Sequence, residues 1–300
     1  GQLDLARKDY ANTLMRLPPG LDFDPGCDAV ACADFNPDDP TAACMESCPN
    51  LFIPRALPEQ PALSPSDGSC DGLTRFECWE RLDYIGGSTP TLVEVPGGPS
   101  VLAYPAKDGH VYLVDALDFG VLHDRYQAAV LCGTTDDPCR WPWAGMIVTQ
   151  PELVWLDERP ILLVPTFMPD KTHAAGVVAL EVAMEGGVPK LKPFWRWPTT
   201  DSAESVERFR RHPSRTRIEP LPSGEEVAWI VETRRGGETG KLLGLHAASG
   251  TLLVEADMVG PGQRFSQPLL IGDKLYVNSC DSDEGESRLV GFAVSEGAGE

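Results

Sequence analysis

A group of arginines stands out in this acidic chain of 300 residues, whose formal net charge is −20. Guanidinium groups bind carboxylates and phosphates through paired hydrogen bonds. Such a group predicts either recognition of an acidic partner or ion pairs within the protein, with the run Asp281–Glu284 as the internal acidic counterpart. We favour internal pairing or solvation and keep recognition as the alternative. The arginines singled out are Arg208, Arg210, Arg211, Arg215, Arg234 and Arg235.

Two tryptophans, Trp141 and Trp143, lie next to Arg140 and close to Cys139. Exposed tryptophan beside arginine is typical of an interface hot spot or of a platform on which sugars stack. Packing at the rim of a core accounts for the pair equally well, so both interpretations stay open.

Metal ligands are sparse. Of the five histidines, His173 and His212 fall in loops expected to share one face, and a metal there would need a third ligand such as Asp281 or Cys280. We predict no metal site and no cofactor, with calcium as a weak candidate. The calcium-like residues are Asp34, Asn36 and Asp38. Their segment lacks the glycine and the final carboxylate of a calcium loop, which favours a solvated acidic turn.

The nine cysteines are the most informative residues for the protein's chemistry. Eight of them lie in close sequence pairs within loops rich in Asp, Pro and Gly: Cys27, Cys32, Cys44, Cys48, Cys70, Cys78, Cys132 and Cys139. Disulfides stabilise such loops and persist in oxidising compartments, so we expect an extracytoplasmic protein of the periplasm, the outer envelope or the secreted fraction. Neighbour pairing of Cys70 with Cys78 and of Cys132 with Cys139 is the first hypothesis. Zinc is the disfavoured alternative, because Cys-x2-Cys spacing is absent.

Other functional classes lack their signatures. The sequence holds no nucleophile elbow, no phosphate-binding glycine loop and no obvious pair of catalytic carboxylates. The negative charge argues against nucleic-acid binding, and no apolar run reaches the length of about 18 residues that a membrane span requires. We therefore expect a protein without catalytic residues. The first residue is Gly, which fits a processed form or part of a precursor.

The elements that position these residues follow a four-fold recurrence of Pro and Leu, at Pro90, Pro151, Pro220 and Pro268, at intervals of roughly 45 to 70 residues. Each proline is expected to open a series of short apolar strands. Each series has a first strand near its proline and further strands after it. For the four series in turn, these further strands are expected at 101–106, 110–115 and 121–126; at 161–167, 176–180 and 191–197; at 226–232, 241–245 and 252–256; and at 274–279 and 288–292. The last series lacks a fourth strand. The pattern predicts an all-β fold, a β-propeller of four blades, with residues 76–84 as the strand that closes the last blade.

Two segments show the repeat best: Asp108–Ala116 followed by Gly120, and Gly240–Gly250. Both resemble the repeats of pyrroloquinoline-quinone-like (PQQ-like) β-propellers, in which a glycine, an apolar strand and a Ser/Thr-Gly turn follow one another. The resemblance covers residues 76–300 and implies a propeller. Members of that family that bind the quinone usually carry more blades and adjacent cysteines, and this chain has no Cys-Cys pair. The resemblance therefore does not imply a bound quinone here.

The first 75 residues differ in composition from the repeats. Mixed spacing of apolar residues over Leu3–Arg16 predicts a short amphipathic helix that ends at Pro18. Residues 21–69 should form an extended, disulfide-stapled arm. We therefore divide the chain into 1–75 and 76–300, and expect the arm to lie across its own propeller, with a second subunit as the alternative binding surface.

Long loops on one face of the predicted propeller hold the arginines, the tryptophans and His212, and binding usually resides in such loops. We predict a non-catalytic scaffold or protein-interaction subunit of a bacterial envelope or extracellular assembly, with protein subunits as partners. The alternatives are a quinone- or metal-dependent oxidoreductase, or a remnant of one, and a carbohydrate-binding propeller.

Overall fold

The computed structural model describes residues 3–4, 9–10, 13–27, 48–52, 54, 66–73, 78, 88–130, 147–167, 175–199, 207–221, 223–234, 238–281 and 286–294. The chain forms two compact units. Unit 1 comprises Gly1–Ile147 and Ala183–Leu191, and unit 2 comprises Val148–Val182 and Lys192–Glu300.

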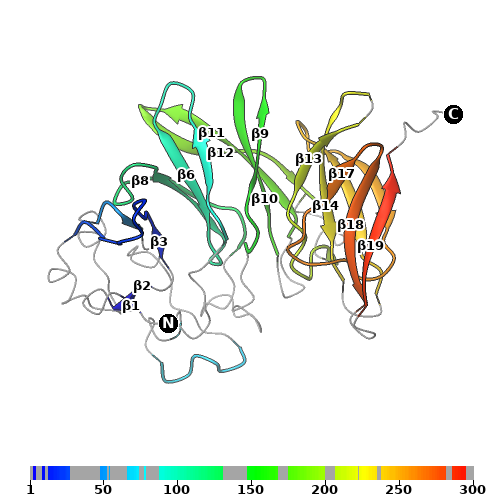
Figure 1. Cartoon of the computed structure of the whole chain (residues 1–300), viewed down its shortest axis with the longest axis horizontal. Helices are drawn as coiled ribbons and strands as arrows, with labels where there is room; N and C mark the ends of the chain where they lie inside the picture. Colours follow the sequence, from blue (N-terminus) through cyan, green and yellow to red (C-terminus); the bar gives the residue numbers. More distant parts are fainter. Residues whose placement is uncertain are drawn as a thin grey trace. The chain divides into compact units, whose positions relative to one another are not determined.

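The described chain is all-β and its sheets are antiparallel (Figure 1). In unit 1, the first sheet has the order β5(Thr91–Glu94), β6(Ser100–Pro105), β7(His110–Asp115), β8(Leu122–Gln127). Strand order equals chain order, so each strand pairs with its successor through a short turn. The strands coincide with the predicted ones to within one or two residues.

The same up-and-down order recurs in the remaining three large sheets. The second has β9(Glu152–Leu156), β10(Arg159–Pro165), β11(Val177–Glu185) and β12(Val188–Trp197), and the tip of its β11–β12 hairpin belongs to unit 1. The third has β13(Arg217–Pro220), β14(Glu226–Glu232), β15(Lys241–His246) and β16(Leu252–Asp257). The last has β17(Leu269–Ile271), β18(Lys274–Asp281) and β19(Glu286–Ala293), so it holds three strands among the described residues, as the sequence predicted.

Two details of the repeat prediction are wrong. Pro220 ends β13 instead of opening it, because the backbone of β13 pairs with β14 from Arg217 onward. Cys78 has helical backbone, which does not fit a closing strand through residues 76–84. The other residues of that segment lie outside the described part, and the number of blades and closure of a ring stay predictions.

A shared glycine explains why the repeats look alike in sequence. Gly109, Gly176 and Gly240 each stand just before the third strand of a sheet. A Cβ atom added at any of them would come closer than 3.0 Å to a backbone carbonyl at the end of the fourth strand or just beyond it. Those carbonyls belong to Ala129, Trp197 and Pro261, respectively. The recurring glycine therefore allows the start of the third strand to touch the end of the fourth.

The predicted N-terminal helix is wrong. The segment instead holds three two-residue strands, β1(Leu3–Asp4), β2(Asp9–Tyr10) and β3(Leu14–Met15). β1 pairs with β2, and β3 pairs with β4(Leu51–Phe52), a strand that the sequence did not predict. A short helix is marginal on its own, whereas pairing with β4 buries Leu14 and satisfies backbone groups in a ladder.

The hydrophobic core of unit 1 joins the arm to the first sheet. Leu14, Cys48, Leu51 and Phe52 pack in one cluster with residues of the sheet and its turns, namely Tyr104, Ala106, Tyr112, Val114 and Phe119. The ring of Phe52 lies 5.5 Å from that of Tyr112 and 6.2 Å from that of Tyr104, edge-on to the latter. The described part of the arm thus packs on its own chain, in agreement with the favoured prediction.

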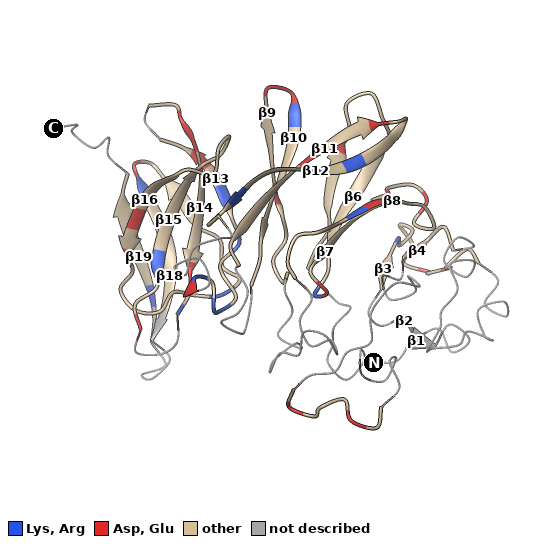
Figure 2. Ribbon diagram, turned by 180° about the vertical axis from the view of Figure 1, so that it is seen from behind, with Lys and Arg blue, Asp and Glu red and all other residues tan. Residues whose placement is uncertain are grey.

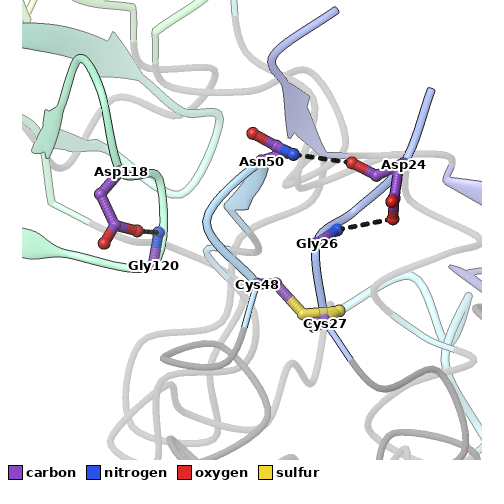
Figure 3. The surroundings of a disulfide bond; sticks show 7 residues. All are labelled: Asp24, Gly26, Cys27, Cys48, Asn50, Asp118 and Gly120. Atoms are coloured by element: carbon purple, nitrogen blue, oxygen red, sulfur yellow. Dashed lines mark hydrogen bonds between the residues drawn. A yellow bond between two sulfur atoms is a disulfide. The ribbon is translucent and has the colours of Figure 1, made fainter. Parts of the chain in front are cut away.

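Two disulfides tie down the N-terminal region. Cys70–Cys78 is the predicted neighbour pair, whereas Cys27 bonds to Cys48 across 21 residues (Figure 3). Asp24 supports the second bond, because its carboxylate accepts the amide of Gly26 at 2.9 Å and its carbonyl accepts the Asn50 side chain at 2.8 Å. These four sulfurs are not thiolates, so they cannot serve as the zinc ligands of the disfavoured alternative. Cys32, Cys44, Cys132 and Cys139 lie outside the described residues.

The core of unit 2 lies between the third and last sheets. Val227, Trp229 and Val231 of β14 form a cluster with Leu275 and Val277 of β18. These are alternate residues on each strand, so one face of each sheet meets the other.

Candidate functional site

Residues 207–216 lead into β13 and form the arginine segment, which carries Arg208, Arg210, Arg211 and Arg215. Ion pairs hold this segment to the third sheet. Arg208 donates hydrogen bonds at 2.8 Å to Glu232 at the end of β14 and at 2.8 Å to Glu255 on β16. Its guanidinium also lies 5.3 Å from the ring centre of Trp197, which meets Phe209 edge-on. Arg208 is 8% exposed, so it anchors this segment and does not present a free cation.

Glu232 is fully buried and is the centre of the arrangement. Besides the hydrogen bond from Arg208, its carboxylate forms an ion pair with Arg234 at 2.5 Å and accepts a hydrogen bond from the backbone amide of Phe209 at 3.4 Å. A buried carboxylate is costly unless it is paired and hydrogen-bonded. Three donors meet that requirement here, and together they fix the position of the arginine segment.

Glu255 extends the network toward solvent. Its carboxylate accepts a hydrogen bond from Lys241 at 2.6 Å in addition to the one from Arg208. Lys241 also forms an ion pair with Asp257 at 3.3 Å. The strand register explains these pairs, since Lys241 lies directly opposite Asp257, and Glu255, two residues before Asp257, is on the same face of β16. Lys241 therefore links β15 to β16, and Arg208 links β14 to β16. Basic and acidic positions lie near one another around these strands in Figure 2.

The network holds its members in their charged forms. Partial burial opposes ionisation of Glu255, but hydrogen bonds from Lys241 and Arg208, and their charges, lower its pKa. Burial also opposes the charge on Arg208, and the two glutamates outweigh it and raise the pKa of that guanidinium. Hydrogen bonding to Glu255 is the main cause of the raised pKa of Lys241.

These side chains border an open recess of about 260 Å³ on unit 2. Its lining consists of Glu207, Arg208, Arg234, Lys241 and Glu255. Arg234 and Lys241 are about one quarter to one third exposed. The recess can exchange ion pairs with a carboxylate or phosphate brought by a partner. Among the described residues that line it, there is no cysteine, serine, threonine or histidine.

Comparisons with known proteins give no family. No protein-family model and no curated protein matches the chain. A solved structure of the Dos1 propeller is similar at a TM-score of 0.37, with 13% identity over 65% of this chain. The match spans 41% of that structure, so this chain corresponds to less than half of it.

Other predicted site residues of unit 2 are distributed around the same segment. Arg215 bonds to Glu152 at 3.1 Å, which is an internal ion pair of the favoured kind. Arg210 and Arg211 are half-buried. The ring of His212 contacts two phenylalanine rings in tilted arrangements, with ring centres 4.1 Å from Phe167 and 5.4 Å from Phe265.

The remaining candidates lie outside the described residues: Trp141, Trp143, Arg235, His173, Asp34, Asn36 and Asp38. Over the ranges that the structure covers, no group of three His, Cys, Asp or Glu side chains is arranged to hold a metal ion. Within the same ranges, no helix has the length and apolar character needed to cross a membrane.

Sequence reasoning missed the acidic half of the network. It assigned the counter-charges to Asp281–Glu284, whereas the described partners of Arg208 are Glu232 and Glu255. A signal was present, because Glu232 follows the apolar run of β14 in a strand whose neighbours are buried. A carboxylate in such a position requires a cationic partner.

Proposed function

We propose that this chain is an exported, non-catalytic β-propeller of the PQQ-like type that serves as a scaffold or protein-interaction subunit of an envelope or extracellular assembly. The recess beside the arginine segment is its partner-binding site. The recurring four-stranded meanders and their shared glycine support the repeat. The two disulfides support folding in an oxidising compartment.

The buried ion pair of Arg208 with Glu232 carries the proposal. This ion pair holds the arginine segment against the third sheet. Arg234 and Lys241 stay partly exposed at the open recess. A preorganised polar surface loses little entropy when a partner binds. The partner group that fits is a carboxylate or phosphate of a protein subunit, which the two cations would contact.

The test is native mass spectrometry of the protein isolated from its source, with metal analysis and an absorbance spectrum of the same sample. Stoichiometric protein subunits are expected, and Arg234→Gln combined with Lys241→Gln should release them. Lys190→Gln is the matched control, since Lys190 is a similarly exposed cation that pairs with Asp124 in unit 1. A monomer that carries a quinone or a metal would favour the oxidoreductase alternative and overturn the proposal.

A further inference from the structure

Two hairpin turns at one end of the third sheet bring a glutamate, a histidine and a serine together. Glu225 lies in the turn between β13 and β14, His246 is the last residue of β15, and Ser249 lies in the turn between β15 and β16. His246 pairs with Val227, two residues after Glu225, so the start of β14 and the end of β15 are neighbours. All of these residues belong to unit 2.

The three side chains contact one another in series. Oγ of Ser249 lies 3.0 Å from Nδ1 of His246, and Nε2 of His246 lies 3.5 Å from Oε1 of Glu225. A carboxylate only accepts hydrogen bonds, so Glu225 favours the imidazole tautomer with its proton on Nε2. Nδ1 is then the acceptor for the serine hydroxyl. This order of hydroxyl, imidazole and carboxylate is the one in which a histidine acts as general base toward a serine.

The hydroxyl of Ser249 is surrounded by hydrogen-bond donors. Its Oγ accepts the backbone amide of Thr251 at 3.3 Å and lies 2.9 Å from Oγ1 of the same threonine. When Ser249 donates to His246, the threonine hydroxyl is the donor to Ser249. Hydrogen bonds to a charged form favour that form. Both donors of Thr251 therefore stabilise negative charge that develops on Oγ as its proton leaves.

The turn itself does not require the histidine side chain, as a comparison with the first sheet shows. Asp115 ends β7 as His246 ends β15, and its carboxylate accepts two amides of its own turn at 2.8 and 3.0 Å. In the third sheet, the backbone carbonyl of His246 accepts the amides of Ser249 and Gly250 at 3.3 and 2.8 Å. The imidazole of His246 is thus directed to Ser249 and Glu225 and does not close the turn.

A tryptophan of the neighbouring sheet holds this turn in place. Nε1 of Trp195 on β12 donates to the carbonyl of Ala247 at 2.8 Å. Its ring packs so closely on Gly250 that an added Cβ there would lie 2.5 Å from a ring atom. Ser249 is exposed, and the side chain of His246 is 32% exposed. The group is therefore both positioned and within reach of a small reagent.

We infer that Ser249 is a nucleophile that accepts an acyl group from an activated ester, with His246 as its general base and Glu225 as the residue that positions the imidazole. The Oγ proton moves to Nδ1 of His246 while Oγ bonds to the carbonyl carbon. The bond from that carbon to the leaving oxygen then breaks, and the leaving oxygen takes the proton from Nδ1. The products are an ester of Ser249 and a free alcohol.

This modification site is separate from the recess. Lys241, which lines the recess, is the first residue of β15, whereas His246 is the last. Transfer of one acyl group leaves the serine modified and ends there, so the inference adds a covalent modification to a scaffold and does not depend on the partner proposed for the recess.

The experiment is acetylation of the full chain by p-nitrophenyl acetate, with the acetyl groups located by peptide mass spectrometry over time. Ser223 is the control within the same molecule, because it is an exposed turn serine whose Oγ accepts the amide of Glu225 at 3.4 Å and has no histidine contact among the described residues. A general base contributes about 10²- to 10⁴-fold. Ser249 should therefore be acetylated at least about 100-fold faster than Ser223.

Two variants test the assigned roles. His246→Gln should slow the acetylation of Ser249 to a rate similar to that of Ser223. Glu225→Ala should also slow it, and should move the ¹⁵N chemical shifts of His246 from those of the Nε2–H tautomer toward those of a mixture, which a merely structural role would not do.

The comparison of the two serines is made within the original chain and needs no variant to fold. Equal acetylation rates of Ser249 and Ser223 would overturn the inference. A fast reaction of Ser249 that persists in His246→Gln would overturn it as well, since the histidine would then not be the base.

Discussion

Arg208 and Glu232 form a buried ion pair at 2.8 Å between the segment before β13 and the end of β14. Their side chains are 10% and 0% exposed, respectively. Arg208, one of the six arginines singled out in the sequence, is therefore an internal anchor. The partly exposed cations beside it, Arg234 and Lys241, are left as the groups that a partner can reach.

Glu232→Gln should destabilise unit 2. The substitution keeps the shape of the side chain but leaves Arg208 and Arg234 without their shared buried counter-charge. Loss of one member of a buried pair costs about 3 to 5 kcal/mol. The free energy of unfolding, measured with urea, should fall by that amount.

Glu219→Gln provides the comparison, because Glu219 pairs with Arg217 at 2.7 Å at a more exposed place on the same sheet. Pairs near the surface contribute about 0 to 1 kcal/mol. Equal losses for the two variants would show that the burial of Glu232 is not decisive.

Stability should also fall in acid because of Asp108, which is buried in unit 1. Burial opposes its charge, but a side-chain hydrogen bond and the charge of His110, the hydroxyl of Tyr112 and the His110 amide together lower its pKa. A carboxyl group whose pKa is depressed in the folded state stabilises above its unfolded pKa of about 3.9. That contribution is lost as the pH falls through the lower, folded value.

Tyr112→Phe separates this effect from packing. The variant keeps the ring on Phe52 but removes a donor to Asp108, so the pKa of Asp108 should be depressed less and less stability should be lost between pH 7 and about pH 2. Urea midpoints measured from pH 7 to about pH 2 would show it. Parallel curves for the original chain, Tyr112→Phe and Asp108→Asn would exclude Asp108 as the source.

Gly240→Ala should destabilise the third sheet. The added Cβ would lie 2.5 Å from the carbonyl oxygen of Pro261 and 3.0 Å from that of Glu232, so backbone must move. Overpacking of this kind costs about 1 to 3 kcal/mol. Gly20→Ala is the control, because no atom lies within 4 Å of its added Cβ. Thermal unfolding of both variants would decide, and equal melting temperatures would contradict the steric explanation of the repeat.

The strands could be predicted because their signal is local. Short apolar runs bounded by glycine and proline, such as His110–Asp115 and Glu226–Glu232, match β7 and β14. Strand burial and turn chemistry act over a few residues, so one sequence suffices to find them. Cys70–Cys78 was predictable for the same reason, as its loop is short.

The arm and the site depend on contacts distant in sequence. Leu14 becomes a strand residue because Phe52 lies beside it, and Cys27 bonds to Cys48 because both ends of that loop pack against the first sheet. The partners of Arg208 lie 24 and 47 residues away. No local pattern gives such pairings, although a glutamate at the end of a buried strand indicates that a cation must be near.

Removal of Cys27–Cys48 by the double substitution Cys27→Ala, Cys48→Ala should loosen the attachment of the arm to the first sheet. Closing a loop of 21 residues restricts the unfolded chain and contributes about 3 kcal/mol. The shorter loop of Cys70–Cys78, with a separation of 8, should contribute about 2.5 kcal/mol. Cys48 is fully buried beside Leu51, so a cavity adds to the first loss. Unfolding free energies without reductant should rank the two double variants in that order, and the reverse order would mean that the arm is held mainly by Phe52 and its aromatic neighbours.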